Sequence, residues 1–174
     1  ESIAQVDLPL LLRLLSAIEK DDANAFYYWN AYSLACRETH ELLLTETAMG
    51  DALVRLLTNL QMTLPNNTCA ESQKVSVSFV SAFAVAASHW AIDKKSTLLG
   101  FLWAWLESQI AAATKLVPLG QTSAQKLLLQ IGSDIDSLMA TVEQVNDEAI
   151  GSSLPGLAMA SSWHETQYSR LFRS

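Results

Sequence analysis

Apolar side chains recur along most of this chain at the spacing of an α-helix. Near its start, Leu8, Leu11, Leu12 and Leu15 follow an i, i+3, i+4, i+7 pattern, which places four leucines on one helical face. Similar patterns follow, separated by short polar breaks, and together they predict an all-α, single-domain helical bundle of about six to eight helices. The expected helices cover residues 7–20, 22–44, 47–61, 74–90, 96–116, 122–147 and 163–172.

The expected helix over residues 122–147 has the most regular apolar spacing. Its apolar positions are separated alternately by three and four residues, which is the a/d spacing of helices that pack side by side. The run is too short for a free-standing coiled coil, so we expect it to pack in the bundle or across a dimer. These positions are Leu128, Ile131, Ile135, Leu138, Val142 and Val145.

The breaks between helices are also informative. Residues 63–73, "TLPNNTCAESQ", combine Pro, Asn and Thr and predict the clearest loop of the chain, and Pro118 with Gly120 predicts a turn. The most membrane-like stretch, "LLGFLWAWL" at residues 98–106, ends at Glu107, far short of the roughly 20 apolar residues that span a bilayer. We therefore expect a buried helix there and no membrane association.

Composition narrows the class of protein. The chain has 174 residues, half of them apolar, which suits one domain with a single core, and its net charge is −7. An acidic chain without a Lys/Arg cluster is a poor partner for nucleic acid, because neutralising phosphates requires concentrated positive charge. Cys36 and Cys69 are too few for a disulfide framework, and no signal peptide is apparent, so we expect reduced thiols and a cytoplasmic protein.

The last fifteen residues, "ASSWHETQYSRLFRS", differ from the preceding part of the chain. Glu165, Arg170 and Arg173 give them a charge of +1, against −8 for the remainder. Ser162 and Glu165 have the spacing of a capping box, which predicts a helix over residues 163–172. So short a helix is marginal in water and should be ordered only if another surface packs on it. We therefore distinguish a helical body, 1–159, from a C-terminal tail of the same domain, 160–174.

The sequence lacks the common catalytic motifs. "HETQY" is not a zinc-binding H-E-x-x-H, because Tyr168 stands at the position of the second histidine. There is no phosphate-binding G-x-x-x-x-G-K-[ST] and no nucleophile elbow G-x-S-x-G. The carboxylates among residues 37–46 are typical of a solvated helix face, with Arg37 and Glu41 paired at i, i+4. These observations argue against an enzyme.

Four segments resemble the UreF family of urease accessory proteins. They are "VDLPLLLRLL" at 6–15, "ACRETHELLLTETAMG" at 35–50, "AATKLVPLGQTSAQKLLL" at 112–129 and "PGLAMASSWHETQYSRLFRS" at 155–174, and they occur in the family's order. The resemblance implies all-helical homodimers that bind the accessory protein UreD (also called UreH) and recruit the GTPase UreG. It further implies delivery of nickel to the urease apoprotein, with nickel as cargo and no tightly bound cofactor or metal site of the protein's own.

The resemblance also implies roles for particular residues. Lys115 matches the lysine of the family's K-L-V-P motif, which is associated with coupling to the GTPase, and Arg170 matches the tail arginine of GTPase recruitment. The tail that binds UreD/UreH is matched by His164, Glu165, Tyr168, Leu171 and Phe172. Family members usually carry an earlier Pro-Val-Gly-Gly segment that is absent here, so we expect a chain truncated at its N-terminus.

Two alternatives to a scaffold stay open at this point. The three histidines, two cysteines and many carboxylates could make the protein a nickel carrier, although their scatter along the chain argues against a tight site. A hydrolase or a direct GTPase is the other alternative, and the missing phosphate loop argues against it.

Overall fold

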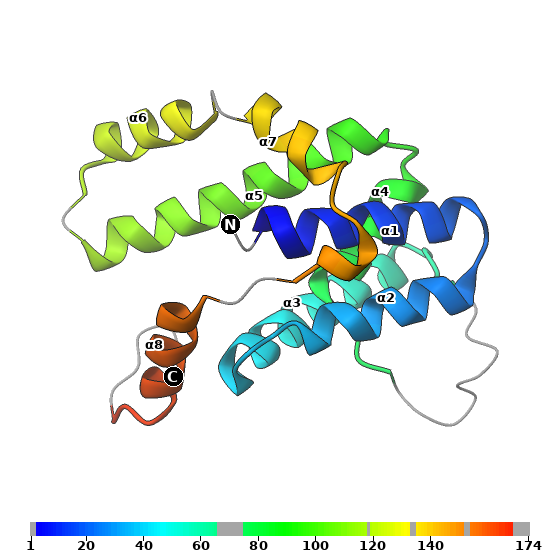
Figure 1. Cartoon of the computed structure of the whole chain (residues 1–174), viewed down its shortest axis with the longest axis horizontal. Helices are drawn as coiled ribbons and strands as arrows, with labels where there is room; N and C mark the ends of the chain where they lie inside the picture. Colours follow the sequence, from blue (N-terminus) through cyan, green and yellow to red (C-terminus); the bar gives the residue numbers. More distant parts are fainter. Residues whose placement is uncertain (1–2, 66–74, 118, 133–134, 152–153, 169–174) are drawn as a thin grey trace.

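The computed structural model describes residues 3–65, 75–117, 119–132, 135–151 and 154–168 and confirms an all-α, single-domain fold (Figure 1). Eight α-helices and two short helical turns make up this part of the chain. The division into a body and a tail at residue 160 stays a prediction. The elements are η1 (Ile3–Asp7), α1 (Leu8–Glu19), α2 (Ala23–Ala35), α3 (His40–Asn59), α4 (Phe79–His89), α5 (Lys94–Leu116), α6 (Gln121–Gly132), α7 (Ile135–Val142), η2 (Asp147–Ala149) and α8 (Pro155–Glu165).

Helix α1 lies at the centre of the core. It packs against α2, α4 and α5, and in Figure 1 it runs between α2 and α5. Its leucine-rich sequence is buried on more than one face, and Leu8, Leu10, Leu11 and Leu14 are fully inaccessible to solvent. Burying these side chains supplies the main stabilisation, at about 25 cal/mol per Å² of apolar surface.

The ends of the core helices are fixed by local hydrogen bonds. Asp22 caps α2 by accepting from the Ala25 amide at 2.9 Å, and Asp93 caps α5 by accepting from the Ser96 amide at 3.0 Å. Hydrogen bonds from the Ser96 side chain and from the Ser96 amide lower the pKa of the Asp93 carboxyl. Two residues after the ends of α1, α3 and α4, the chain adopts a left-handed backbone, at Asp21, Gln61 and Ala91 respectively.

A short extended segment before α4 is held tightly in the core. The Asn30 side chain of α2 donates to the Ser76 carbonyl and accepts from the Ser78 amide, each at 2.9 Å. On the other side, Gly50 of α3 lies so close that a Cβ there would be 1.9 Å from the Val77 carbonyl oxygen. Only glycine fits this crossing.

The predicted helix over residues 22–44 was wrong, because the chain turns after Ala35 and α3 begins at His40. Thr39 adopts an extended backbone and its hydroxyl accepts from the Leu42 amide at 3.3 Å, which starts a new helix. Residues 40–44, expected at the end of one helix, and residues 47–59, expected in the next, therefore belong to the single continuous helix α3.

The predicted helix over residues 122–147 was also wrong, since its described residues form two helices, α6 and α7. Gly132, a poor helix former, is the last residue of α6. Leu128 and Val142 are buried, but Ile131 is 41% exposed, so the expected apolar positions do not make one seam.

The segment at residues 98–106 lies in α5, where it packs into the core as expected. Leu98, Phe101, Leu102 and Leu106 are buried on one side of the helix. Among the described residues, no helix is both long enough and apolar enough to cross a membrane.

Candidate partner-binding site

The C-terminal helix α8 begins earlier and ends earlier than the sequence predicts. It runs from Pro155 to Glu165, so Ser162 lies inside the helix and the expected capping box was wrong. Pro155 occupies the first turn, where its fixed φ and missing N–H are suited to starting a helix. Tyr168 follows the helix, and Arg170, Leu171 and Phe172 lie outside the described residues.

Helix α8 is held against the beginning of α3 by polar contacts. The Glu165 carboxylate accepts from the Glu41 amide at 2.9 Å, and His164 Nδ1 lies 2.7 Å from Glu41 Oε2. The hydroxyls of Ser161 and Thr39 are 2.7 Å apart. The first amides of a helix have no partner within it and attract negative charge, so the Glu165 carboxylate complements the start of α3. The surface that orders this segment is therefore the chain's own α3.

The other side of α8 presents large apolar groups to solvent. No residue of α8 is buried, and the Trp163 side chain is 67% exposed. Met159, on the same face, and the following Tyr168 are exposed as well. Exposed tryptophan and methionine in one small area are typical of a protein-binding surface.

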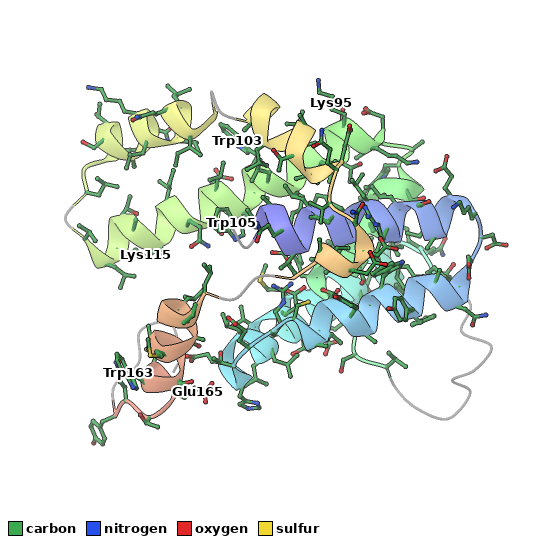
Figure 2. All side chains as sticks on the ribbon, in the orientation of Figure 1. Lys95, Trp103, Trp105, Lys115, Trp163 and Glu165 are labelled. Carbon is green, nitrogen blue, oxygen red and sulfur yellow. The ribbon has the colours of Figure 1, made fainter. Side chains whose placement is uncertain are left out.

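Lys115, the one predicted site residue outside the C-terminal segment, lies on helix α5. It is exposed in the last turn of α5, next to the exposed Leu116 and Val117, before the turn that leads to α6. Figure 2 shows Lys115 at the end of α5, and Trp163 and Glu165 on α8. The structure thus brings His164 and Glu165 together at α3 and places Lys115 at the end of α5.

Helix α6, which follows the turn after α5, also exposes apolar side chains. Leu129 is 71% exposed, and Leu127 and Ile131 are also exposed. Ala124 and Leu128 are buried on this helix, which packs against α5. Helix α6 therefore carries apolar residues toward both the core and the solvent, as helices at protein interfaces do.

The structure also contains a buried charge cluster that the sequence did not reveal. It is centred on Arg37, in the loop between α2 and α3. Arg37 Nη2 lies 2.6 Å from Asp7 Oδ1 and 3.1 Å from Glu46 Oε2. The expected Arg37–Glu41 pair was wrong, because Arg37 lies in the loop and Glu41 contacts His164. The carboxylates were wrongly expected to form a solvated face, since the side chains of Glu41 and Glu46 are only 14% and 13% exposed.

Burial shifts the pKa values in this cluster. Loss of hydration raises the pKa of Glu46 even though Arg37 lies beside it. Burial disfavours the charged Arg37 guanidinium, but the two carboxylates outweigh this and raise its pKa. The Glu46 carboxylate also accepts from the Val80 amide at 3.3 Å, so the cluster joins η1, α3 and the start of α4.

The charge cluster lies at a cavity of about 490 Å³ between helices α3, α5 and α8. Most of its walls are apolar, contributed by Phe79, Phe101 and Trp105 among others. Leu154 and Leu157 form the wall on the side of α8. The half-buried Cys36 also borders it, and burial raises the pKa of its thiol.

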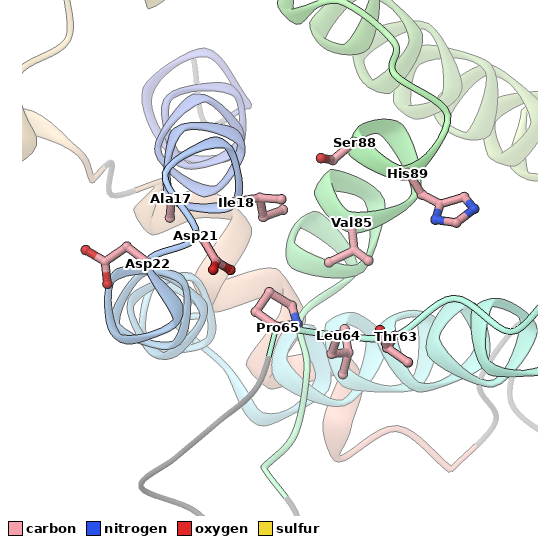
Figure 3. Close-up of a pocket in the computed structure, with 10 residues that line it drawn as sticks. All are labelled: Ala17, Ile18, Asp21, Asp22, Thr63, Leu64, Pro65, Val85, Ser88 and His89. Atoms are coloured by element: carbon pink, nitrogen blue, oxygen red, sulfur yellow. The ribbon is translucent and has the colours of Figure 1, made fainter.

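A second, smaller cavity of about 310 Å³ lies at the end of α1 (Figure 3). Asp22 and His89 are on opposite sides of it, and the Asp22 carboxylate is engaged in capping α2. Asp22 and His89 therefore do not converge on a common point. Across the described residues, no three His, Cys, Asp or Glu side chains are grouped so that they could hold a metal ion.

Comparison with known proteins identifies a family model and several relatives that match this chain. Residues 1–132 match the family model UreF. The chain is 49% identical over 174 residues to the urease accessory protein UreF of Marinomonas sp. (strain MWYL1), covering all of this chain and 74% of that protein. It is 44% identical to the UreF proteins of Alkalilimnicola ehrlichii and Hahella chejuensis, covering 99% and 100% of this chain and 75% and 77% of theirs.

Proposed function

This chain belongs to the UreF family of urease accessory proteins, and from that membership we propose that it is a non-enzymatic scaffold for assembling the nickel centre of urease. A role in urease maturation follows from the family itself. The observation that best supports a scaffold is the surface of α8, which exposes large apolar groups and is held to the body by polar contacts. Such a surface suits binding to another protein.

The first partner in this proposal is UreD/UreH, which binds α8 and the residues that follow it. Trp163 and Tyr168 are exposed where that partner would contact the chain. His164 and Glu165, matched to the family's tail, keep α8 at the start of α3. The partner would then meet an oriented apolar surface, and less ordering would be required on binding.

The second partner is the GTPase UreG, which the scaffold recruits and gates. Lys115 is exposed at the end of α5, where a cation also complements the helix dipole. Arg170 offers a planar guanidinium that can bond to a carboxylate or phosphate with two hydrogen bonds. Nickel is cargo of the complete assembly and passes to the urease apoprotein, and the scaffold itself holds no cofactor tightly.

The scaffold acts as a cytoplasmic homodimer in this proposal. The exposed Leu127, Leu129 and Ile131 of α6 support a second copy packing on this helix, because burying them would remove apolar surface from water. The dimer would leave the outer surface of α8 available to UreD/UreH.

A pull-down with purified UreD/UreH and UreG tests the proposal. Arg170→Ala should lose UreG and keep UreD/UreH, whereas the matched control Arg173→Ala should keep both. If Arg170→Ala retains UreG at the level of the unmodified chain, the role assigned to Arg170 is wrong. If the unmodified chain binds neither protein, the scaffold proposal itself fails.

A further inference from the structure

The cavity beside α8 has the size and lining of a binding site. Its volume of about 490 Å³ falls in the range of about 300 to 1,000 Å³ typical of ligand pockets. Apolar side chains come to it from helices α3, α4, α5 and α8, which lie apart in the sequence but together in the fold. The principal ones are Leu42, Met49, Phe79, Phe101, Trp105 and Leu157.

The charges around the cavity restrict what it can accept. Asp7, Glu38 and Glu46 border it, and Arg37 is the single cation among the described residues that line it. Arg37 Nη2 already lies within 3.1 Å of both Asp7 and Glu46, so two carboxylates offset the Arg37 charge, while the buried Arg37 Nε has no hydrogen-bond partner among the described residues. An anionic occupant would meet uncompensated negative charge in a partly buried place, which is costly. The cavity therefore suits a neutral or basic group.

The cavity mouth lies beside α8, the helix already assigned to a partner. Leu157 and Met49 are 49% and 45% exposed at its edge, so apolar surface extends from the cavity to the solvent. Leu157 lies on the same helix as His164, seven positions earlier, which is about 10 Å along an α-helix. A protein bound along α8 would reach the mouth of the cavity without a change in the fold.

We propose that the protein which binds α8 inserts a bulky apolar side chain, carried on a neutral or basic segment, into this cavity. The inference rests on the proposed function, because it takes the partner to be UreD/UreH. An aromatic or leucine side chain would pack against Phe101 and Trp105, and a basic neighbour would face the exposed Glu38. Anchors of this kind, enclosed in a pocket, carry a large share of binding energy at interfaces.

Filling the cavity tests the proposal. Ala104 borders the cavity from α5 and is exposed, so Ala104→Trp should occupy part of the space without disturbing the core. Its control is Ala111→Trp, an exposed position on the same helix outside the cavity. In titrations with purified UreD/UreH, Ala104→Trp should weaken binding by about ten-fold or more and Ala111→Trp by less than about two-fold.

Photo-crosslinking provides a measurement that does not depend on a bulky substitution being tolerated. Benzoylphenylalanine at position 104 should crosslink to UreD/UreH in the assembled complex, and at position 111 it should not. If the complex forms but position 104 gives no crosslink, or crosslinks a second copy of this chain, the cavity is not the partner's site and the scaffold proposal still stands. If the unmodified chain does not bind UreD/UreH, both proposals fail.

Discussion

Helices α4 and α8 have the same length of eleven residues but are stabilised in different ways. Seven residues of α4 are buried, and it packs against α1, α2 and α3. None of α8 is buried, and its described contacts to α3 include the polar groups of Ser161, His164 and Glu165. Packing therefore fixes α4, whereas a few hydrogen bonds position α8.

This difference separates stability from binding within one domain. Removing α4 from the core would expose apolar side chains and disrupt the fold, so its opening should require nearly global unfolding. Moving α8 would break polar contacts that water can replace and would expose little additional apolar surface. An element of the second kind can adapt to a partner at small cost in folding free energy.

Introducing a single methyl group should show the contrast most strongly. Gly50→Ala would place a Cβ 1.9 Å from the Val77 carbonyl oxygen, so we expect a loss of about 3 kcal/mol or more, or failure to fold. The control is Gly156→Ala in α8, where no atom lies within 4 Å of the added Cβ. That change should leave stability unchanged or raise it by up to about 1 kcal/mol. Urea unfolding of both variants measures the difference, and equal stabilities would contradict the account.

Truncating leucines should give the next largest contrast. Leu14 is fully buried in α1, so Leu14→Ala should lower the free energy of unfolding by about 2 to 5 kcal/mol. Leu129 is 71% exposed on α6, and Leu129→Ala should change it by less than about 0.5 kcal/mol. Both are measured for the isolated chain at a concentration low enough to avoid self-association. A large loss for Leu129→Ala under those conditions would mean that α6 belongs to the rigid core.

Removing a polar contact of α8 should have a smaller and local effect. Glu165→Ala leaves the Glu41 amide without the carboxylate, so the local opening free energy of α8 should fall by about 1 kcal/mol. Hydrogen exchange should become faster in α8 and stay unchanged in α1 and α4. Glu107→Ala, at an exposed position on α5, serves as a control. Faster exchange throughout the protein after Glu165→Ala would show that α8 supports the core.

The pH dependence of stability should reveal the buried Glu46. Because burial raises its pKa in the fold, ionising Glu46 costs stability, and its contribution is greatest below the unfolded pKa of about 4.3. As the pH rises through the folded pKa, the native chain should lose stability relative to Glu46→Gln. Urea unfolding from pH 4 to pH 7 compares the two, with the exposed Glu38→Gln as control. Parallel curves for the native chain and Glu46→Gln would contradict this interpretation.

The sequence predicts the core of this fold better than its outer parts. Periodic leucines locate α1, and the apolar run at 98–106 locates the part of α5 that packs into the core, because buried positions require apolar side chains. The sequence analysis missed the break before His40, because the residues around Thr39 are compatible with a continuous helix. In the structure Thr39 is extended and caps the start of α3. Likewise, Ser162 and Glu165 satisfy the capping-box spacing, but Pro155 starts the helix earlier.

The candidate site was only partly predictable for a related reason. The Asp7–Arg37–Glu46 cluster joins residues from η1, from α3 and from the loop between α2 and α3, and no local sequence spacing reveals such contacts. The sequence did identify the C-terminal segment as unusual, through its aromatic residues and its charge. The roles of Lys115 and Arg170 rest on the family resemblance, since isolated basic residues have no distinguishing pattern of their own.

Hydrogen exchange of the chain with and without UreD/UreH tests the central claim most directly, namely that a rigid helical core carries a separately adjustable binding helix. The account predicts that the partner slows exchange in α8 by about ten-fold or more and leaves α1 and α4 unchanged. Protection spread evenly over α1 and α4, or no change in α8 while the complex is formed, would contradict it.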